Sequence, residues 1–185
     1  MATVIPVRLG KTTAYIVEGT GGCVLIDTGP TATAASILST LSRSRCESLE
    51  AVVMTHTHYD HTRALASLCS HVDVDVLVQK EEAESLRAGF TPLPRGTSLL
   101  PKLIAVIGVT FNASLTRYIG VEPTVVVDEA LGLHSYGVDG SVIHTPGHTA
   151  GSMSVILESG EAFVGDTLFH ILGGRVYPPF ADRPD

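Results

Sequence analysis

The chain has 185 residues, of which 44% are hydrophobic and 17% are charged, and this is enough apolar material for a single compact domain over residues 1–185. The formal net charge is −7, and no cluster of Lys and Arg provides the basic face that nucleic-acid binding needs. Nucleic acids and membrane surfaces are therefore excluded as expected partners, which leaves a small-molecule substrate.

The N-terminus and the cysteines indicate the compartment. The first ten residues, MATVIPVRLG, have neither the basic start nor the long apolar run of a signal peptide. The three cysteines are an odd number without CxxC spacing, so we expect a cytoplasmic protein in a reducing environment. Cys23 and Cys69 lie in apolar patterns typical of buried thiols, and Cys46 lies in a polar turn, so none is expected to be catalytic.

The first 42 residues predict a meander followed by a helix. Residues 2–9, 12–18 and 22–27 have the composition of short strands separated by Gly-containing turns, which is typical of antiparallel pairing. The third strand ends in Asp27-Thr28-Gly29, which on its own is an ordinary strand-end turn. Residues 31–42 place their apolar side chains on one side of a predicted amphipathic helix.

The segment LEAVVMTHTHYDH over residues 49–61 carries the most chemistry. Its apolar part predicts a strand buried on both faces. His56 and His58 are two residues apart, so in extended backbone their side chains leave the chain on the same side and converge on one ion. Asp60 and His61 then open a predicted helix, whose N-terminus favours a carboxylate. One strand-to-helix loop thus presents four potential metal ligands.

After this loop, strands and helices alternate until the pattern breaks. The helix is expected to continue over residues 62–69, and a strand over 72–78 and a polar helical segment over 80–87 follow. The proline-containing stretch 88–127 has an uncharged centre, which is too short to span a bilayer. We interpret it as an insertion that forms a cap beside the site, a dimer contact or an extension of the core.

Two further motifs follow the insertion. Residues 141–149, SVIHTPGHT, predict a short strand that enters a Pro-Gly turn carrying His148, and this turn leaves the histidine little conformational freedom. His144 precedes the proline by two residues and is either a partner of the site or a half-buried strand histidine. Residues 153–165 predict a hairpin that ends in Gly165-Asp166.

These motifs together resemble those of the metallo-β-lactamase-fold hydrolases. T-H-T-H-Y-D-H at residues 55–61 matches the family signature HxHxDH, and P-G-H-T at 146–149 and G-D at 165–166 follow in the family's order. The resemblance covers nearly the whole chain. It implies an α/β (α+β) fold, an αββα four-layer sandwich, with metal ions at one edge between the two sheets.

The resemblance also implies the roles of the site residues. It assigns metal ligation to His56, His58, Asp60, His61, His148 and Asp166. The three neutral imidazoles of the first site leave zinc an open position for water, whose pKa falls to about 7 on such a site, and the resulting hydroxide is the nucleophile. The second ion is zinc, with iron and manganese as alternatives, and Asp166 bridges the two.

Two aspartates have further implied roles. Asp60 is the candidate catalytic residue that accepts the proton of the nucleophile. Asp27, in the D-T-G turn, supports the metal loop from beneath by hydrogen bonding. No serine elbow or Cys/His pair competes for the role of nucleophile.

The C-terminal part departs from the family pattern. The family supplies a further histidine to the second metal from a late loop, whereas only His170 follows Asp166, four residues later. The last strand and helix of the sandwich are also missing after Asp166. We therefore expect a truncated chain, or a ligand donated from elsewhere, and poor binding of the second metal. The chain should either form a homodimer or aggregate through an exposed sheet edge.

The substrate is the last expectation. Residues 165–177, GDTLFHILGGRVY, resemble the stretch of glyoxalase II enzymes in which a basic residue and a tyrosine contact glutathione, and Arg175 and Tyr177 match this pair by type. A surface arginine and a packed tyrosine are the alternative reading. We expect a zinc-dependent hydrolase of a thioester, ester or lactone. A phosphodiesterase or nuclease-type member of the same fold and a non-catalytic metal-binding scaffold remain alternatives.

Overall fold

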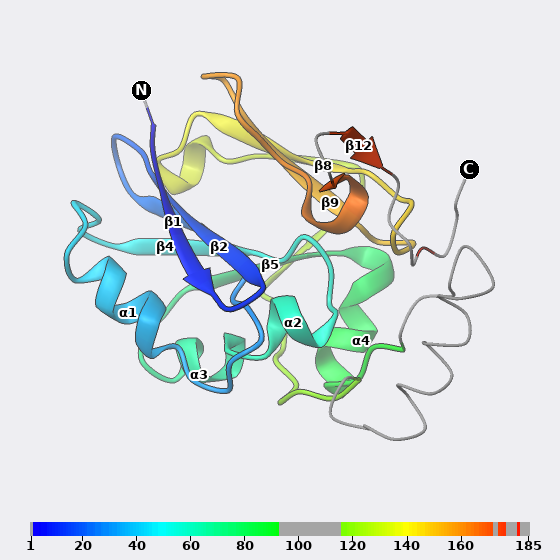
Figure 1. Cartoon of the computed structure of the whole chain (residues 1–185). Coiled ribbons are helices and arrows are strands. Elements are labelled where there is room, and N and C mark those ends of the chain that lie inside the picture. The colour runs from blue at the N-terminus through cyan, green and yellow to red at the C-terminus, as the bar shows by residue number, and fades with distance from the viewer. Residues whose placement is uncertain (1, 93–115, 172–173, 177–180, 182–185) are drawn as a thin grey trace.

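Two stacked β-sheets form the middle of the fold, and helices cover one of them (Figure 1). The structure is a computed structural model that describes residues 2–92, 116–171, 174–176 and 181, with the backbone alone for 169–171 and 174–176. The expected insertion falls largely on residues 93–115, which lie outside the described residues.

The larger sheet has six strands in chain order. They are β1 (Thr3–Leu9), β2 (Thr12–Glu18), β3 (Cys23–Ile26), β4 (Leu49–Val53), β5 (Asp75–Gln79) and β6 (Val125–Val127). The first three pair antiparallel, so the predicted meander is confirmed, and β3 to β6 pair parallel. Residues 125–127, inside the expected insertion, thus belong to this sheet.

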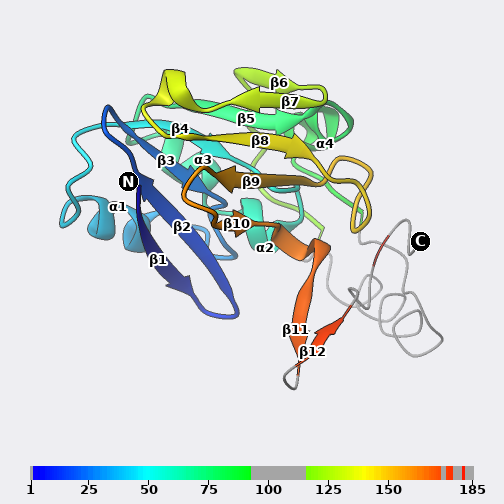
Figure 2. The ribbon, with the colours of Figure 1, turned by 90° about the horizontal axis from the view of Figure 1, so that it is seen from above.

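The smaller sheet has four antiparallel strands in the order β10-β9-β8-β7 (Figure 2). They are β7 (Ala130–Gly132), β8 (Gly140–His144), β9 (Met153–Leu157) and β10 (Ala162–Phe163). The hairpin predicted before Gly165 is the pair β9 and β10. A separate pair, β11 (Phe169–Ile171) and β12 (Gly174–Val176), projects from the body of the fold in Figure 2.

The helices are short. They are α1 (Ala35–Leu41), α2 (Tyr59–Thr62), α3 (Leu65–Cys69) and α4 (Ala83–Ala88), with 3₁₀ turns η1 (Lys80–Glu82), η3 (His134–Tyr136) and η4 (Gly165–Thr167). The helix predicted to run unbroken to residue 69 is interrupted after α2, where the Arg63 N–H donates to both Gly29 O and Tyr59 O. Among the described residues, no helix is long and apolar enough to cross a membrane.

The larger sheet is buried on both faces, which explains its apolar strands. On one face, Ile37, Leu68 and Leu86 of the helices pack in the same cluster as Val52 of β4. On the other face, Val53 packs in a cluster with side chains of the smaller sheet. The expectation of a strand buried on both faces is therefore confirmed for β4. The described residues form helix, sheet and sheet layers of the expected αββα sandwich, and the helix layer beyond the smaller sheet is not among them.

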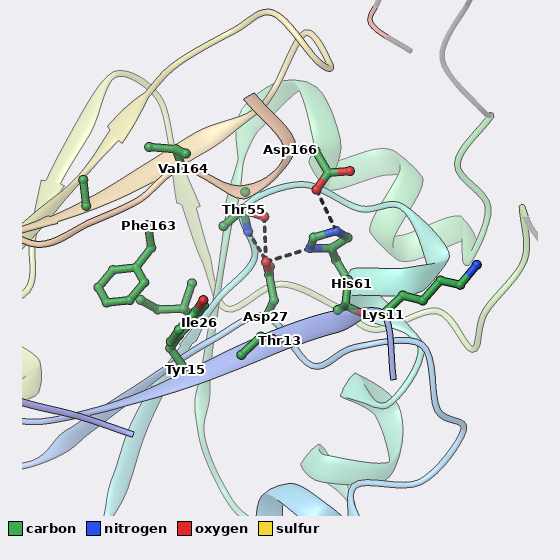
Figure 3. Close-up of a pocket in the computed structure, with 13 residues that line it drawn as sticks. Lys11, Thr13, Tyr15, Ile26, Asp27, Thr55, His61, Phe163, Val164 and Asp166 are labelled. Carbon is green, nitrogen blue, oxygen red and sulfur yellow. Dashed lines mark hydrogen bonds and ion pairs between the residues drawn. The ribbon is translucent and has the colours of Figure 1, made fainter. Parts of the chain in front are cut away.

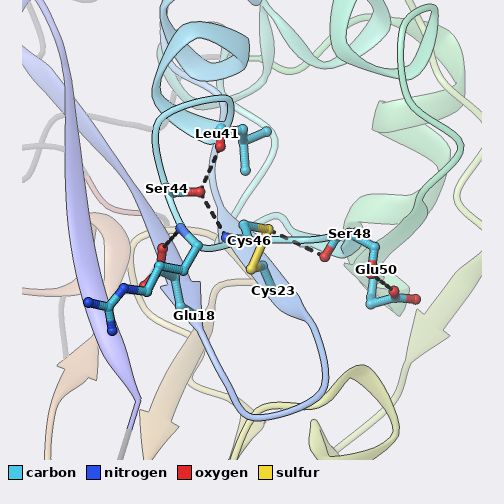
Figure 4. Close-up of a disulfide and its surroundings, with 8 residues drawn as sticks. Glu18, Cys23, Leu41, Ser44, Cys46, Ser48 and Glu50 are labelled. Atoms are coloured by element: carbon cyan, nitrogen blue, oxygen red, sulfur yellow. Dashed lines mark hydrogen bonds between the residues drawn. A yellow bond between two sulfur atoms is a disulfide. The ribbon is translucent and has the colours of Figure 1, made fainter.

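The expectation of free thiols at Cys23 and Cys46 is wrong, because the two form a disulfide (Figure 4). Their Cα atoms are 5.7 Å apart, although 23 positions separate them in sequence. The chain returns beside β3 because Cys23 N donates to Ser48 O, and the Glu18 carboxylate accepts the Arg45 N–H at 2.7 Å. Cys69 is the free cysteine. The cysteines therefore give no support to a reducing cytoplasm.

The disulfide should stabilise the fold measurably. A cross-link between residues 23 positions apart restricts the unfolded chain, and loop entropy assigns this restriction about 3 kcal/mol. Cys23→Ser should lower the free energy of unfolding, measured in urea, by about 3 kcal/mol. Reductant should lower the wild-type free energy of unfolding by the same amount. Cys69→Ser is the control and should keep the response to reductant. Three titratable thiols in the native oxidised protein would contradict the pairing.

Candidate metal centre

Four buried histidines meet at the edge where the two sheets come together. His56 and His58 lie on the loop after β4, and His61 lies in α2, which begins directly after His58. His148 reaches the same place from the loop between β8 and β9 of the other sheet. The two sheets are tied here, since Met153 N of β9 donates to Thr55 O at 2.7 Å.

The histidines form two overlapping groups of potential ligands. His56, His58 and His148 form one group, and His56, His61 and Asp166 form the other, with the ligand atoms of each group within 4.8 Å of one another. In the first group, His58 Nδ1 and His148 Nε2 are 3.0 Å apart. Three imidazoles at such separations match a tetrahedral zinc site with one position left for water.

Several ring nitrogens have no hydrogen-bond partner in the protein. The Nε2 atoms of His56, His58 and His61 are buried without a hydrogen bond. His61 Nε2 lies 3.3 Å from Asp166 Oδ1, which is an ion-pair distance but lacks hydrogen-bond geometry. A buried nitrogen without a hydrogen bond costs free energy, and metal ions held by the two groups would give these rings a partner. The residues present therefore fit a metal ion.

Asp27 holds two parts of the metal loop (Figure 3). Its Oδ1 accepts the Thr55 N–H, and its Oδ2 accepts the Thr55 hydroxyl and lies 2.8 Å from His61 Nδ1. Because Thr55 gives its proton to Asp27, its Oγ1 accepts from His56 Nδ1 at 3.1 Å. In their neutral form both rings thus carry the proton on Nδ1, which leaves the lone pair of Nε2 free for a metal.

The D-T-G turn also fixes the backbone of His61. The carbonyl of His61 accepts from Thr28 N at 2.7 Å, Thr28 Oγ1 at 2.8 Å and Gly29 N at 3.0 Å. To form this turn, Asp27 adopts φ of 59°, the left-handed region that is costly for a residue with a Cβ. The strand-end turn of the sequence is thus the support of α2.

Asp166 enters the site because Gly165 allows the backbone to approach Thr55 closely. A Cβ at Gly165 would lie 2.6 Å from Thr55 Oγ1, and the residue has φ of 52°. The carboxylate is 3.3 Å from His61 Nε2 through Oδ1 and 3.8 Å from His148 Nε2 through Oδ2. Burial would raise the pKa of Asp166, but the neighbouring histidines lower it overall. Asp166 thus belongs to the second group and also lies near His148 of the first.

Asp60 belongs to neither group, so the structure brings together five of the six expected ligands. Its carboxyl is half-buried, and burial raises its pKa, an effect that the nearby Asp166 charge increases and His61 opposes. A carboxylate with a raised pKa is a stronger proton acceptor. Asp60 thus lies beside the site with the properties of a base.

The remaining expectations fall elsewhere. Tyr177 lies outside the described residues, and Arg175 is described only as a backbone position of β12 that pairs with His170. His144 is not in either group, but its Nε2 lies 2.8 Å from Ala150 O in the turn that carries His148. It therefore braces that turn rather than the histidine itself.

A cavity of about 310 Å³ opens beside His61 and Asp166 (Figure 3). The hairpin between β1 and β2 forms one wall, with Lys11, Thr12 and Thr13. The rings of Tyr15 and Phe163 pack at a centroid distance of 4.8 Å and give the cavity an apolar side. The cavity thus joins apolar surface directly to the potential ligands.

Sequence reasoning missed four residues that support the site. Thr55 is described above, and the others are Glu82, Thr91 and Tyr118, which surround Thr57. Thr55 stood within the motif at the end of a buried strand, a polar position that needs a partner. The other three had no such signal, because their contacts join residues 25 or more positions apart.

Comparison with known proteins decides the family. The sequence profile of the metallo-beta-lactamase superfamily matches residues 7–185. The chain belongs to the metallo-beta-lactamase superfamily. Structures of superfamily members share its fold. The BLEG-1 B3 metallo-beta-lactamase superposes with a TM-score of 0.68 at 22% identity, covering 91% of this chain and 74% of that one. BJP-1 of Bradyrhizobium japonicum superposes with a TM-score of 0.65 at 18% identity, covering 95% of this chain and 57% of that one.

Two of the relatives by sequence are named as hydrolases. A probable metallo-hydrolase of Methanocaldococcus jannaschii is 28% identical over 169 residues, which are 91% of this chain and 73% of the relative. A hydroxyacylglutathione hydrolase of Erwinia tasmaniensis is 26% identical over 161 residues, which are 86% of this chain and 48% of the relative. The chain thus spans about half the length of that hydrolase. These relatives support its assignment as a metal-dependent hydrolase.

The buried histidines of this superfamily member should make the stability of its metal-free form depend on pH. Burial, followed by neighbouring histidines, lowers the pKa of His58 to about 3 and lowers that of His56 well below its usual value. Burial alone would lower the pKa of His61 too, but Asp27 and Asp166 raise it overall. The unfolded values are about 6.5.

The signs of these shifts place the stability maximum near pH 6.5. Below about pH 6.5 the unfolded chain binds protons that His56 and His58 in the folded protein do not, so stability falls as pH falls. Above about pH 6.5, the contribution of His61 is lost as pH rises through its folded pKa. Urea unfolding with a chelator from pH 5 to 8 measures this dependence of stability on pH. In His58→Ala, the fall in stability below about pH 6.5 should be smaller. A flat profile of the wild-type protein would contradict the account.

Proposed function

We propose that the chain is a zinc-dependent hydrolase that cleaves a thioester, ester or lactone. The observation that carries this proposal is the pair of ligand groups sharing His56, with buried ring nitrogens that have no hydrogen bond. The printed name of one relative, hydroxyacylglutathione hydrolase, supports a thioester as the first substrate class to test. The proposed partner is a small molecule.

The proposal gives each group its own ion. His56, His58 and His148 would hold the first, while His61 and Asp166, with Asp60 beside them, would hold the second. The position of Asp166 between His61 and His148 supports a carboxylate shared by both ions. A bound zinc ion supplies Lewis acidity and lowers the pKa of water to about 7.

The protein residues would then orient the reactants. Asp27 keeps His56 and His61 with their Nε2 atoms directed to the centre, through the contacts with Thr55 and His61. Asp60 would accept a proton, because its carboxyl is close to His61 and has a raised pKa. The cavity beside the packed rings of Tyr15 and Phe163 would take an apolar part of the substrate, which excludes water from that side.

A phosphodiesterase is the alternative within the same fold. It would need cations to bind the phosphate, and the formal net charge of −7 gives it no support. A non-catalytic scaffold would bind the metal without turnover. A homodimer is proposed separately and is tested by the molar mass in solution.

The decisive experiment is metal analysis of the purified protein together with a panel of substrates. Zinc-loaded protein should hydrolyse a hydroxyacyl thioester of glutathione or a lactone faster than a phosphodiester, and chelation should abolish the activity. Stoichiometric zinc without hydrolysis of any thioester, ester or lactone would contradict the proposed activity.

His58→Ala should abolish both tight zinc binding and turnover. The change removes one of three nitrogens from the first group, and two imidazoles with water in the remaining positions hold zinc far less tightly than three. Isothermal titration with zinc and the same substrate panel measure the two effects. The matched control is His134→Ala, since His134 is an exposed histidine paired with Glu158 on the surface. Stoichiometric zinc with the wild-type Kd in His58→Ala would contradict the assignment.

A further inference from the structure

A buried carboxylate outside both ligand groups holds the loop between the first two histidines. Glu82 lies in η1, directly after β5, and is 5% exposed. Its Oε2 accepts the Thr57 N–H at 3.1 Å and also the Thr57 hydroxyl. Such a desolvated carboxylate is stable only with partners, and Thr57 supplies two of them.

Thr57 is held on its remaining side by Thr91. The hydroxyl of Thr91 donates to Thr57 O at 2.7 Å, and it lies 2.8 Å from the hydroxyl of Tyr118. The N–H, the hydroxyl and the carbonyl of Thr57 are thus all bonded, and the residue is fully buried. Because Thr57 separates His56 from His58, fixing it fixes the backbone from which both rings extend.

Glu82 also touches the loop that carries the third histidine. A Cβ at Gly151 would lie 2.5 Å from Glu82 Cγ and 2.8 Å from Gln79 Oε1, so this loop packs directly on the Glu82 side chain. Gly151 follows His148 by three residues. One side chain thus contacts both chain segments that contribute to the group of His56, His58 and His148.

The sheet order explains why a carboxylate stands there. The metal loop follows β4, which lies between β3 and β5. Asp27 follows β3 and binds Thr55, whereas Glu82 follows β5 and binds Thr57. Since parallel strands end at the same edge, the two carboxylates hold alternate residues of the loop from opposite sides.

We propose that Glu82 is a positioning residue for metal binding. It sets the separation of His56 and His58 and holds their loop in place against the loop that carries His148. This inference rests on the proposed function only in that the site binds zinc. Removing the carboxylate would leave the buried Thr57 N–H without its acceptor in the protein. The loop would then adopt other conformations, and part of the zinc-binding energy would be spent on ordering it.

The test compares three variants of the full chain with the wild type by zinc Kd, by the visible spectrum of the cobalt-substituted protein and by kcat and KM. Glu82→Ala should weaken zinc binding about 10- to 100-fold and change the cobalt spectrum. It should also lower kcat by a larger factor than the factor by which it changes KM. Glu82→Gln should stay within about threefold of the wild-type Kd, because the amide oxygen accepts the same two donors. Glu81→Ala is the control, since Glu81 is the exposed neighbouring residue of the same charge.

Circular dichroism and urea unfolding of the metal-free variants separate positioning from folding. If Glu82→Ala does not fold, Thr57→Val takes its place, because valine keeps the shape and the N–H but removes the hydroxyl from Glu82. It should change the cobalt spectrum in the same way with a smaller loss of affinity. A folded Glu82→Ala, or the substitute Thr57→Val, with the wild-type zinc Kd and cobalt spectrum would overturn the proposal.

The failure of the proposed function is distinguishable. Wild-type protein that binds zinc but hydrolyses no substrate overturns the activity alone, and the zinc Kd and cobalt spectrum of the variants still decide the role of Glu82. Wild-type protein that binds no zinc overturns both.

Discussion

The carboxylate of Asp27 is the interaction on which the site depends most. It joins the end of β3 to the metal loop through Thr55 and to α2 through His61. The residue reaches this position with left-handed backbone, a conformation that costs about 1–3 kcal/mol. Hydrogen bonds to a charged acceptor contribute more than neutral ones, so three of them offset this cost. A neutral or longer side chain at residue 27 would lose either the charge or the fit.

The centre lies where two sheets meet, and this has consequences for stability. His56, His58 and His61 come from the larger sheet and its helix, whereas His148 and Asp166 come from loops of the smaller sheet. In the metal-free protein the two sides are joined by the apolar cluster around Val53 and by contacts such as that of Met153 N with Thr55 O. An ion bound by both sides would add its binding free energy to that of folding.

Motif spacing predicted much of the fold and the residues that meet in the site. The i, i+2 spacing of His56 and His58 and the Pro-Gly turn of His148 are local features, and each fixes a direction of the side chain. The alternation of strands and helices likewise follows from local apolar patterns. Residues described only by backbone, such as Arg175, and those outside the described part, such as Tyr177, stay predictions.

The features that sequence reasoning missed all depend on contacts between distant positions. The disulfide joins residues separated by 23 positions, and Glu82 reaches Thr57 across 25. Within its own segment, Glu82 resembles the exposed Glu81 and Glu84, and only the neighbouring strand order makes it buried. The break between α2 and α3 has the same origin, because Arg63 bonds to Gly29 of a distant turn.

The most direct test of the central claim is anomalous diffraction from crystals of the zinc-loaded protein at the zinc absorption edge. The account predicts a peak about 2.0–2.1 Å from a nitrogen of each of His56, His58 and His148, and a weaker peak next to His61 and Asp166. Zinc found only at other residues, such as Cys69 or the exposed His134, with no peak among the four buried histidines, would contradict it.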